Sequence, residues 1–262
     1  MLKSIYTPVS GALTQERVLE VISNNLANMN TAGFKGDHVG FEVLLPEPNK
    51  RYQDPLPPAN YKVDLEKMMP LRGNEVAYVG VSEIKRDETQ GPAISTSNPT
   101  DMMVEGKGMF VVQTPEGTRY TRNGNFSLSP EGVLTTKAGD PVLGQKGHVA
   151  VRSGQFEVNT LGEVYQDGRM VDRLQVMEFS EQANLERVGD NYFIFGGSPD
   201  QMQPGQNYGV RQGYIEGSNV NAVKNLTAMI LAHRSYEAYQ KAVSNFDQMM
   251  EKSSNSIGEI RA

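Results

Sequence analysis

The sequence predicts an α+β fold in which long N- and C-terminal helices pair as a coiled-coil-like stem around an inserted antiparallel all-β domain. Apolar residues near both ends of the chain recur at steps of three and four, the spacing of a helical seam. Residues 98–213 instead form short β-branched and aromatic runs separated by glycine-containing turns. Between the N-terminal pattern and these runs lies a proline-rich stretch, which excludes a third long helix there.

Residues 2–29 are predicted to form the first helix, within an N-terminal segment of residues 1–35. A proline near a helix start is tolerated, and Gly33 is placed to cap the end. Pro8 and Gln15 are the weak positions of the seam. Its other a and d positions hold Ile5, Ala12, Leu19, Ile22, Leu26 and Met29.

Asparagines crowd the end of this helix, although their amides compete for the backbone and disfavour helix. One interpretation is that the helix frays toward its cap, which suits Asn28 and Asn30. The other is that the amides hydrogen-bond to neighbouring helices, where a buried polar group fixes register. For Asn24 and Asn25 both interpretations stay open.

Residues 36–95 are predicted to be an extended connector. Prolines stand at positions 46, 48, 55, 57 and 58, and such clusters form semi-rigid extended chain. Within the connector, Val76, Tyr78, Val79 and Val81 favour one short strand.

Residues 96–212 are predicted to form the antiparallel β domain. Asn123-Gly124 and Asp167-Gly168 favour two-residue hairpin turns, because both residues accept positive φ. The expected strands are 102–104, 109–113, 118–121, 125–128, 133–136, 156–158, 164–166, 174–179 and 192–195.

Residues 213–262 contain the second predicted helix. A helix of roughly 40 residues would be about 60 Å long, which is more than a compact domain needs. The pattern therefore indicates a partner helix elsewhere in the chain or in a neighbouring subunit. The seam positions are Met229, Ala232, Tyr236, Tyr239, Val243, Phe246, Met250, Ser253, Ile257 and Ile260.

Composition excludes several classes of protein. The 262 residues carry a net charge of -6 with both signs interspersed, so nucleic acid is not an expected partner. The mean hydropathy of -0.48 and the lack of a long apolar run argue against membrane insertion. The N-terminus does not resemble a cleaved signal peptide. The absence of cysteine excludes disulfides and zinc-thiolate sites.

No catalytic, cofactor or metal constellation is predicted. Gly106-Lys107-Gly108 lacks the further glycines of a nucleotide-binding loop and is interpreted as a hairpin turn. Asp101 and Glu105 are interpreted as surface carboxylates, since no aromatic sugar platform accompanies them. The three histidines, His38, His148 and His233, stand far apart without partners at metal-ligand spacing.

Several strings closely resemble those of the bacterial flagellar rod and hook proteins. Near the N-terminus these are Ser23-Asn24-Asn25-Leu26-Ala27-Asn28 and Thr31-Ala32-Gly33-Phe34-Lys35. The C-terminal string is Gly213-Tyr214-Ile215-Glu216-Gly217-Ser218-Asn219-Val220-Asn221. Between them, Asn98-Pro99-Thr100-Asp101 and Tyr120-Thr121-Arg122-Asn123-Gly124-Asn125-Phe126 resemble the opening of the family's β domain. Tyr78-Val79-Gly80-Val81 and Lys224-Asn225 favour a proximal rod protein, with a distal rod protein as the alternative.

The resemblance implies a structural subunit of the periplasm-spanning rod that transmits torque from the flagellar motor. Terminal helices would form the inner tube, and the β domain would face outward. Implied partners are other rod proteins, copies of the same chain in a helical array, and the flagellar type III export apparatus, which exports such subunits without a cleaved signal. The expected assembly interface consists of Leu19, Ile22, Asn24, Asn25, Leu26, Asn28, Ser218, Asn219, Val220, Met229, Tyr236, Tyr239, Val243, Phe246 and Met250.

Two other classes remain as alternatives. One is an enzyme that acts on peptidoglycan, and the other is a soluble module whose long helix binds a single different partner.

Overall fold

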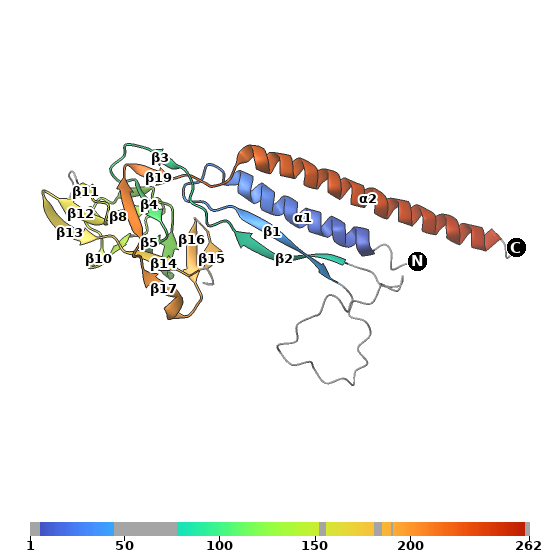
Figure 1. Cartoon of the computed structure of the whole chain (residues 1–262), viewed down its shortest axis with the longest axis horizontal. Helices are drawn as coiled ribbons and strands as arrows, with labels where there is room; N and C mark the ends of the chain where they lie inside the picture. Colours follow the sequence, from blue (N-terminus) through green and yellow to red (C-terminus); the bar gives the residue numbers. More distant parts are fainter. Residues whose placement is uncertain (1–5, 45–77, 152–155, 181–184, 190, 260–262) are drawn as a thin grey trace, which may run out of the picture. The chain divides into compact units, whose positions relative to one another are not determined.

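A computed structural model describes residues 6–44, 78–151, 156–180, 185–189 and 191–259 (Figure 1). The chain divides into two compact units. The helical unit consists of the described residues of Met1–Asn24, Asp37–Lys85 and Val223–Ala262. The β unit consists of the described residues of Asn25–Gly36 and Arg86–Ala222. Long helices and antiparallel sheets are both present, in agreement with the predicted α+β class.

The helical unit contains two long helices and a two-stranded ribbon. Helix α1 spans Tyr6–Ala27, its last residues belonging to the β unit, and helix α2 spans Ala222–Glu259. The two helices run side by side in opposite directions (Figure 1). Strand β1 (Asp37–Leu44) pairs with β2 (Tyr78–Arg86). The sequence predicted only part of β2 and missed β1, while Val76 and the proline cluster lie outside the described residues.

The expected coiled-coil-like pairing of the helices is wrong. A coiled coil inserts bulky apolar knobs from both helices, but α1 buries Pro8, Gly11 and Thr14 along the first half of its covered face. A Cβ on Gly11 would lie 2.6 Å from the Tyr239 ring, so a glycine notch receives that side chain. Among the α2 residues whose side chains are described, only Ala232 is buried.

The physical reason lies in the composition of α1. Along its first half the buried positions are Pro8, Gly11 and Thr14, and the buried aliphatic side chains Val21 and Ile22 come only near its end. The hydroxyl of Thr14 donates back to the carbonyl of Ser10 at 2.8 Å. Leu13 is 61% exposed. The period of three and four therefore identified the inward face of α2, but the first half of α1 does not offer that face matching apolar knobs.

The β unit is built of short antiparallel strands around one main sheet. The order in that sheet is β15-β16-β6-β5-β14-β17. Its strands are β5 (Met109–Thr114), β6 (Gly117–Thr121), β14 (Val176–Phe179), β15 (Leu185–Val188), β16 (Tyr192–Phe195) and β17 (Met202–Pro204). A three-stranded sheet contains β11 (Phe156–Val158), β12 (Glu163–Gln166) and β13 (Arg169–Arg173).

Four strand pairs complete the β unit. They are β3 (Ala93–Ser95) with β19 (Tyr214–Glu216), β4 (Met102–Gly106) with β18 (Tyr208–Gln212), β7 (Phe126–Leu128) with β8 (Leu134–Thr136), and β9 (Leu143–Gly144) with β10 (Gly147–His148). A short 3-10 helix, η3 (Pro199–Gln201), precedes β17. Every strand expected between residues 102 and 195 has a counterpart among these elements.

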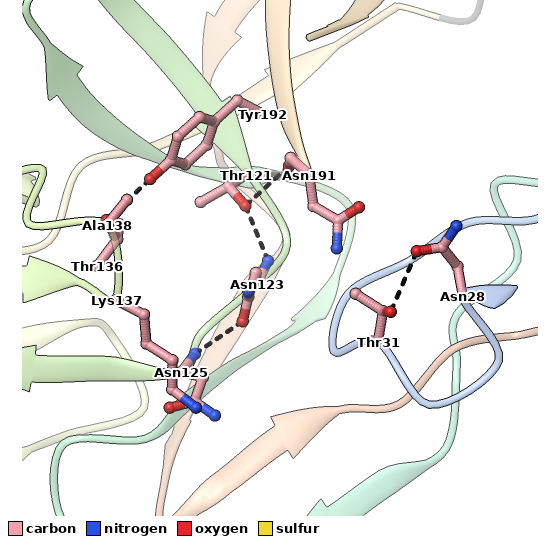
Figure 2. A pocket seen from close by; sticks show the side chains of 10 residues that line it. All are labelled: Asn28, Thr31, Thr121, Asn123, Asn125, Thr136, Lys137, Ala138, Asn191 and Tyr192. Atoms are coloured by element: carbon pink, nitrogen blue, oxygen red, sulfur yellow. Dashed lines mark hydrogen bonds between the residues drawn. The ribbon is translucent and has the colours of Figure 1, made fainter. Parts of the chain in front are cut away.

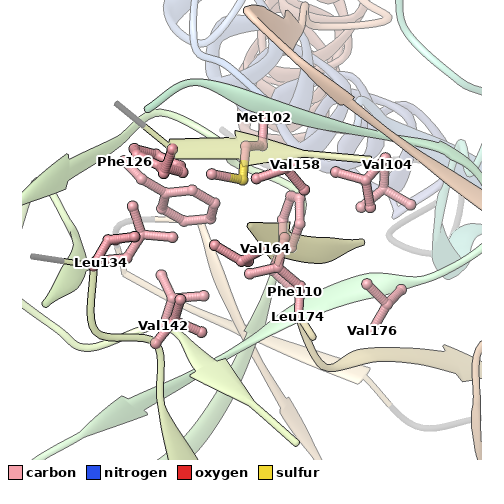
Figure 3. Close-up of a cluster of buried hydrophobic side chains, with 14 of the residues drawn as sticks. Met102, Val104, Phe110, Phe126, Leu134, Val142, Val158, Val164, Leu174 and Val176 are labelled. Carbon is pink, nitrogen blue, oxygen red and sulfur yellow. The ribbon is translucent and has the colours of Figure 1, made fainter. Parts of the chain in front are cut away.

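Two clusters of buried side chains lie on opposite faces of strand β5. Phe110 and Val112 belong to the larger cluster, which also contains Phe126 and Leu134 (Figure 3). Met109 and Val111 belong to the smaller one. Successive side chains of a strand point to opposite faces, so this strand has a continuous apolar run because both faces are covered.

Neither helix in the described part of the chain combines the length and the apolar character that a bilayer crossing requires.

Candidate functional site

The helical unit holds the C-terminal part of the predicted assembly interface. Met229, Tyr236, Tyr239, Val243 and Phe246 are half-buried, and Met250 is 39% exposed. A groove of about 290 Å³ runs between the helices. It is lined by Val9, Ala12, Leu13, Glu16, Tyr236, Gln240, Val243, Ser244 and Asp247.

A second apolar stripe on α2 was missed by the sequence reasoning. Val223 is 75% exposed, Leu226 51% and Ile230 56%, and Leu231 beside them is 58% exposed. The steps from 223 to 226 and 230 are again three and four, so the signal was present in the sequence. The neighbouring seam from Met229 onward is longer, so the sequence pattern favours that seam over this stripe.

The predicted N-terminal interface residues are divided by the structure. Leu19 is half-buried, Ile22 is buried and Asn24 is exposed in the helical unit. Asn25 is only 2% exposed and belongs to the β unit, as does half-buried Leu26. Asn25 is thus a buried polar side chain, whereas Asn24 is exposed.

Residues 218–220 hold the end of the β unit in place. The amide of Asn219 donates to the carbonyl of Asp87 at 2.8 Å, and its oxygen accepts from the backbone N–H of Gly36 at 2.8 Å. Ser218 is 9% exposed, and its hydroxyl accepts from the N–H of Val220 at 3.3 Å. These predicted interface residues therefore make internal contacts that join residues 36, 87 and 219.

Glu216 is the centre of a buried charge cluster that the sequence did not reveal. Its side chain is 0% exposed and forms ion pairs with Lys35, which is 1% exposed, and with Arg122 at 3.3 Å. The carboxylate also accepts from the N–H of Gly91 at 3.0 Å, and Lys35 donates to the carbonyl of Thr89 at 2.7 Å. The cluster joins four separated segments of the β unit.

Arg122 completes this cluster through the backbone of β4. Its guanidinium donates to the carbonyls of Gly106 at 2.6 Å and Val104 at 3.2 Å. Burial lowers the pKa of Arg122, while the charges of Glu216 and Glu88 oppose that shift. Arginine starts from so high a pKa that it stays charged at neutral pH. The cluster consequently holds a permanent cation whose counter-ion is buried with it.

Two further arginines connect other segments to the main sheet: Arg187 contacts the segment around Lys35, and Arg86 at the end of β2 contacts β16. The Arg187 guanidinium lies 4.5 Å from the ring centre of Phe34 and donates to the carbonyl of Lys35 at 2.6 Å. The Arg86 guanidinium lies 4.4 Å from the ring centre of Phe193. Such cation–π contacts stabilise most where water is excluded.

The β unit also contains a polar pocket of about 540 Å³ (Figure 2). Ten residues from four chain segments line it: Asn28, Thr31, Thr121, Asn123, Asn125, Thr136, Lys137, Ala138, Asn191 and Tyr192. In Figure 2 the Asn28–Thr31 pair lies across from Thr136 and Tyr192, with the Thr121–Asn125 run between them. We refer to it as the polar pocket.

Internal hydrogen bonds hold the walls of the polar pocket. The Thr121 hydroxyl donates to the carbonyl of Asn191 at 3.1 Å and accepts from the N–H of Asn123 at 3.0 Å. The Asn123 side-chain oxygen accepts from the N–H of Asn125 at 3.1 Å. Opposite them, the Tyr192 hydroxyl lies 2.8 Å from the Thr136 hydroxyl. These bonds fix the side chains of Thr121, Asn123, Thr136 and Tyr192.

The candidate chemical residues are dispersed. Glu105 forms an ion pair with Arg211 at 2.8 Å. Asp101 is only 4% exposed, so it is a buried carboxylate and not the surface carboxylate that was expected. His233 lies 3.4 Å from Glu237 one turn along α2. Within the described residues, no group of three or more histidine, aspartate or glutamate side chains is placed to hold a metal ion.

Three family models match successive parts of the chain. The model described as "Flagella basal body rod protein" matches residues 5–35. "Flagellar hook protein FlgE/F/G D1 domain" matches residues 103–174, and "Flagellar basal body rod FlgEFG protein C-terminal" matches residues 211–256.

Relatives match over nearly the whole length. The flagellar basal-body rod protein FlgG of Caulobacter vibrioides is 32% identical over 97% of this chain and 98% of its own. FlgF of the same organism is 30% identical over 99% of this chain and 100% of its own. The flagellar hook-basal body complex protein FlhO of Bacillus subtilis is 32% identical over 99% of this chain and 100% of its own. The chain belongs to the flagellar basal-body rod protein family and is a structural subunit of the rod.

Proposed function

We propose that this rod subunit assembles through its helical unit, which packs against copies of the chain and against other rod proteins to form the axial tube. Exposed apolar residues on α1 and α2 carry the proposal. Leu13, Val223, Ile230 and Leu231 are each more than half exposed, and contiguous apolar surface marks interaction sites.

The energy available from this surface is substantial. Full burial of one such side chain stabilises by about 1.5–3 kcal/mol, so completing a half-finished burial contributes about 1 kcal/mol per residue. Several residues in a row on one helix therefore supply a driving force for association. A contact of this kind that does not close on itself propagates as a helical filament.

Torque transmission in this proposal requires stiffness and no chemistry. A close-packed tube has low compressibility and passes strain along its length. The β unit, with covered apolar clusters on both faces of β5, would decorate the outside of the tube.

Substitutions in the helical unit test this proposal. Ile230→Asp, Val243→Asp and Phe246→Asp should each prevent incorporation into basal bodies, because each places a charge in a contact that must exclude water. The matched control is Leu161→Asp, at a residue that is 53% exposed in the β unit. Basal bodies would be purified and the subunit quantified by immunoblotting. Normal motility together with normal incorporation of Ile230→Asp and Phe246→Asp would refute the proposal.

The position along the rod is a finer part of the proposal. We propose a proximal, FlgF-type subunit, with a FlgG-type distal subunit as the alternative. Support comes from Lys224-Asn225, where FlgG relatives would be expected to carry an acidic pair, although relatives of both names match at similar identity. Electron microscopy of basal bodies from a deletion strain distinguishes them, since loss of a proximal subunit leaves only the rod base.

Export and the absence of catalysis complete the proposal. We expect the flagellar type III apparatus to export the chain uncleaved, so mass spectrometry of rod-incorporated protein should find its intact N-terminal peptide. Release of soluble muropeptides by the purified protein would favour the enzyme instead. A stable heterodimer with one different protein would favour the binding module.

A further inference from the structure

We propose that the polar pocket of the β unit binds an uncharged saccharide that carries acetamido groups. The proposal rests on the chemistry and the rigidity of the pocket.

The lining chemistry matches a ligand made of hydroxyl and amide groups. Asparagine amides both donate and accept hydrogen bonds, and threonine hydroxyls do the same. Four asparagines and three threonines are among the ten lining residues. Ligand pockets of about 300–1,000 Å³ are usually mostly apolar, so a pocket of about 540 Å³ with this lining selects a polar ligand.

The charges of the lining argue against anionic polymers. Lys137 is the one charged residue among the ten that line the pocket, and it is exposed. A phosphate backbone needs several cations along its path. A single ammonium group, with three donors, instead suits the hydroxyls of a neutral sugar.

The walls of the pocket also argue against an extended peptide. Peptides commonly bind by adding a strand to an exposed sheet edge, where the backbone supplies the hydrogen bonds. Here Asn123 and Asn125 lie between β6 and β7, and Lys137 and Ala138 lie in the turn that follows β8. The strand residues in the lining, Thr121, Thr136 and Tyr192, belong to strands that are already paired, so the cavity does not offer a free strand edge.

Hydrogen bonds within the protein hold the wall residues of the pocket in fixed positions. The Tyr192 hydroxyl donates to Asp140 at 2.7 Å, which fixes the ring that forms one wall. Asn191 holds a left-handed backbone with φ of 60° and donates from its amide to the carbonyl of Ala32 at 3.3 Å. Rigid walls reduce the entropic cost of binding. The Tyr192 ring and the Ala138 methyl supply apolar surface for an acetamido methyl group.

The test is titration of the full-length protein with the trimer of N-acetylglucosamine, followed by calorimetry and by saturation-transfer NMR. We expect saturable binding in the millimolar range or tighter. Asn125→Leu and Lys137→Met should each weaken it roughly 3- to 10-fold, the effect of one lost hydrogen bond. Asn207→Leu and Lys107→Met are matched controls at exposed residues outside the pocket and should bind like the parent protein.

Three outcomes would overturn the proposal. They are the absence of saturable binding, equal binding by the parent protein and both pocket variants, and displacement of the sugar by an extended alanine peptide. Thermal unfolding of each variant separates a lost ligand contact from a lost fold, and the exposed position of Lys137 keeps at least one pocket variant folded. A negative result leaves the assembly prediction for Ile230 and Phe246 untouched.

Discussion

Replacing Glu216 by glutamine should destabilise the β unit far more than the same change at an exposed ion pair. The carboxylate is 0% exposed and is the shared counter-ion of Lys35 and Arg122, which are 1% and 9% exposed. Glutamine keeps the shape and one acceptor for the N–H of Gly91, but it leaves two buried cations without an anion between them.

The magnitude follows from this geometry. Removing one partner of a buried ion pair costs about 3–5 kcal/mol, because the remaining charge stays desolvated. Glu105 provides the matched comparison, since it pairs with Arg211 at the surface. The side chain of Glu105 is 47% exposed and that of Arg211 is 39% exposed. Exposed pairs contribute about 0.2–1 kcal/mol. Glu105→Gln should therefore be almost silent while Glu216→Gln removes a large fraction of a stability of about 5–15 kcal/mol.

Thermal unfolding measures both variants. Tyrosine fluorescence is the convenient signal, since the chain has 11 tyrosines and no tryptophan. About 3–5 kcal/mol corresponds to a fall in Tm of roughly 6–20 °C for a unit of this size. The double variant Lys35→Met with Glu216→Gln should lose less than the sum of the single changes, because the two residues interact directly. Equal Tm values for Glu216→Gln and Glu105→Gln would refute the reasoning.

Three further predictions concern backbone and packing. Gly124→Ala should destabilise the β unit by about 1–3 kcal/mol, because the new Cβ would lie 1.5 Å from the carbonyl oxygen of Met102. An unchanged urea midpoint would contradict this close approach. Gly11→Ala should lower the Tm of the helical unit despite alanine's better helix propensity, because the new methyl group would clash with the Tyr239 ring. Tyr239→Ala should relieve that loss in a double-variant cycle, and purely additive effects would exclude the notch. Asp167 has a φ of 50°, which glycine adopts freely and valine does not. Asp167→Val should therefore lower the free energy of unfolding in urea by about 1–3 kcal/mol, whereas Asp167→Gly should be tolerated. Equal urea midpoints for the two variants would show that the turn can relax.

Local patterns account for the strands that were predicted correctly. The run Met109–Thr114 is rich in apolar and β-branched residues, and the turn at Pro115 and Glu116 follows it immediately, so β5 and β6 are neighbours in sequence and in space. Strands β4 and β18 also pair, but Met102 meets Gln212 across more than a hundred residues. No local signal specifies such a partner, which is why β18 was missed.

The helical seam illustrates the same limit. Period alone located the covered face of α2, where Ala232 is buried and Tyr236, Tyr239 and Val243 are half-buried. It could not show that the partner surface on α1 would be a glycine notch. Knob-into-hole packing depends on the shapes of both helices, and the sequence pattern describes each helix separately.

The sequence by itself determined the α+β class, the two terminal helices, about half of the described strands of the β unit and, through its motifs, the family. These follow from periodicity and turn chemistry, which act over a few residues. Only the tertiary structure decided the burial of Lys35, Arg122 and Glu216, the assembly of the polar pocket from four segments, and which apolar residues of α2 stay uncovered. A charged or amide side chain reads as solvated in sequence, and its true environment is set by residues that the fold brings to it from elsewhere in the chain.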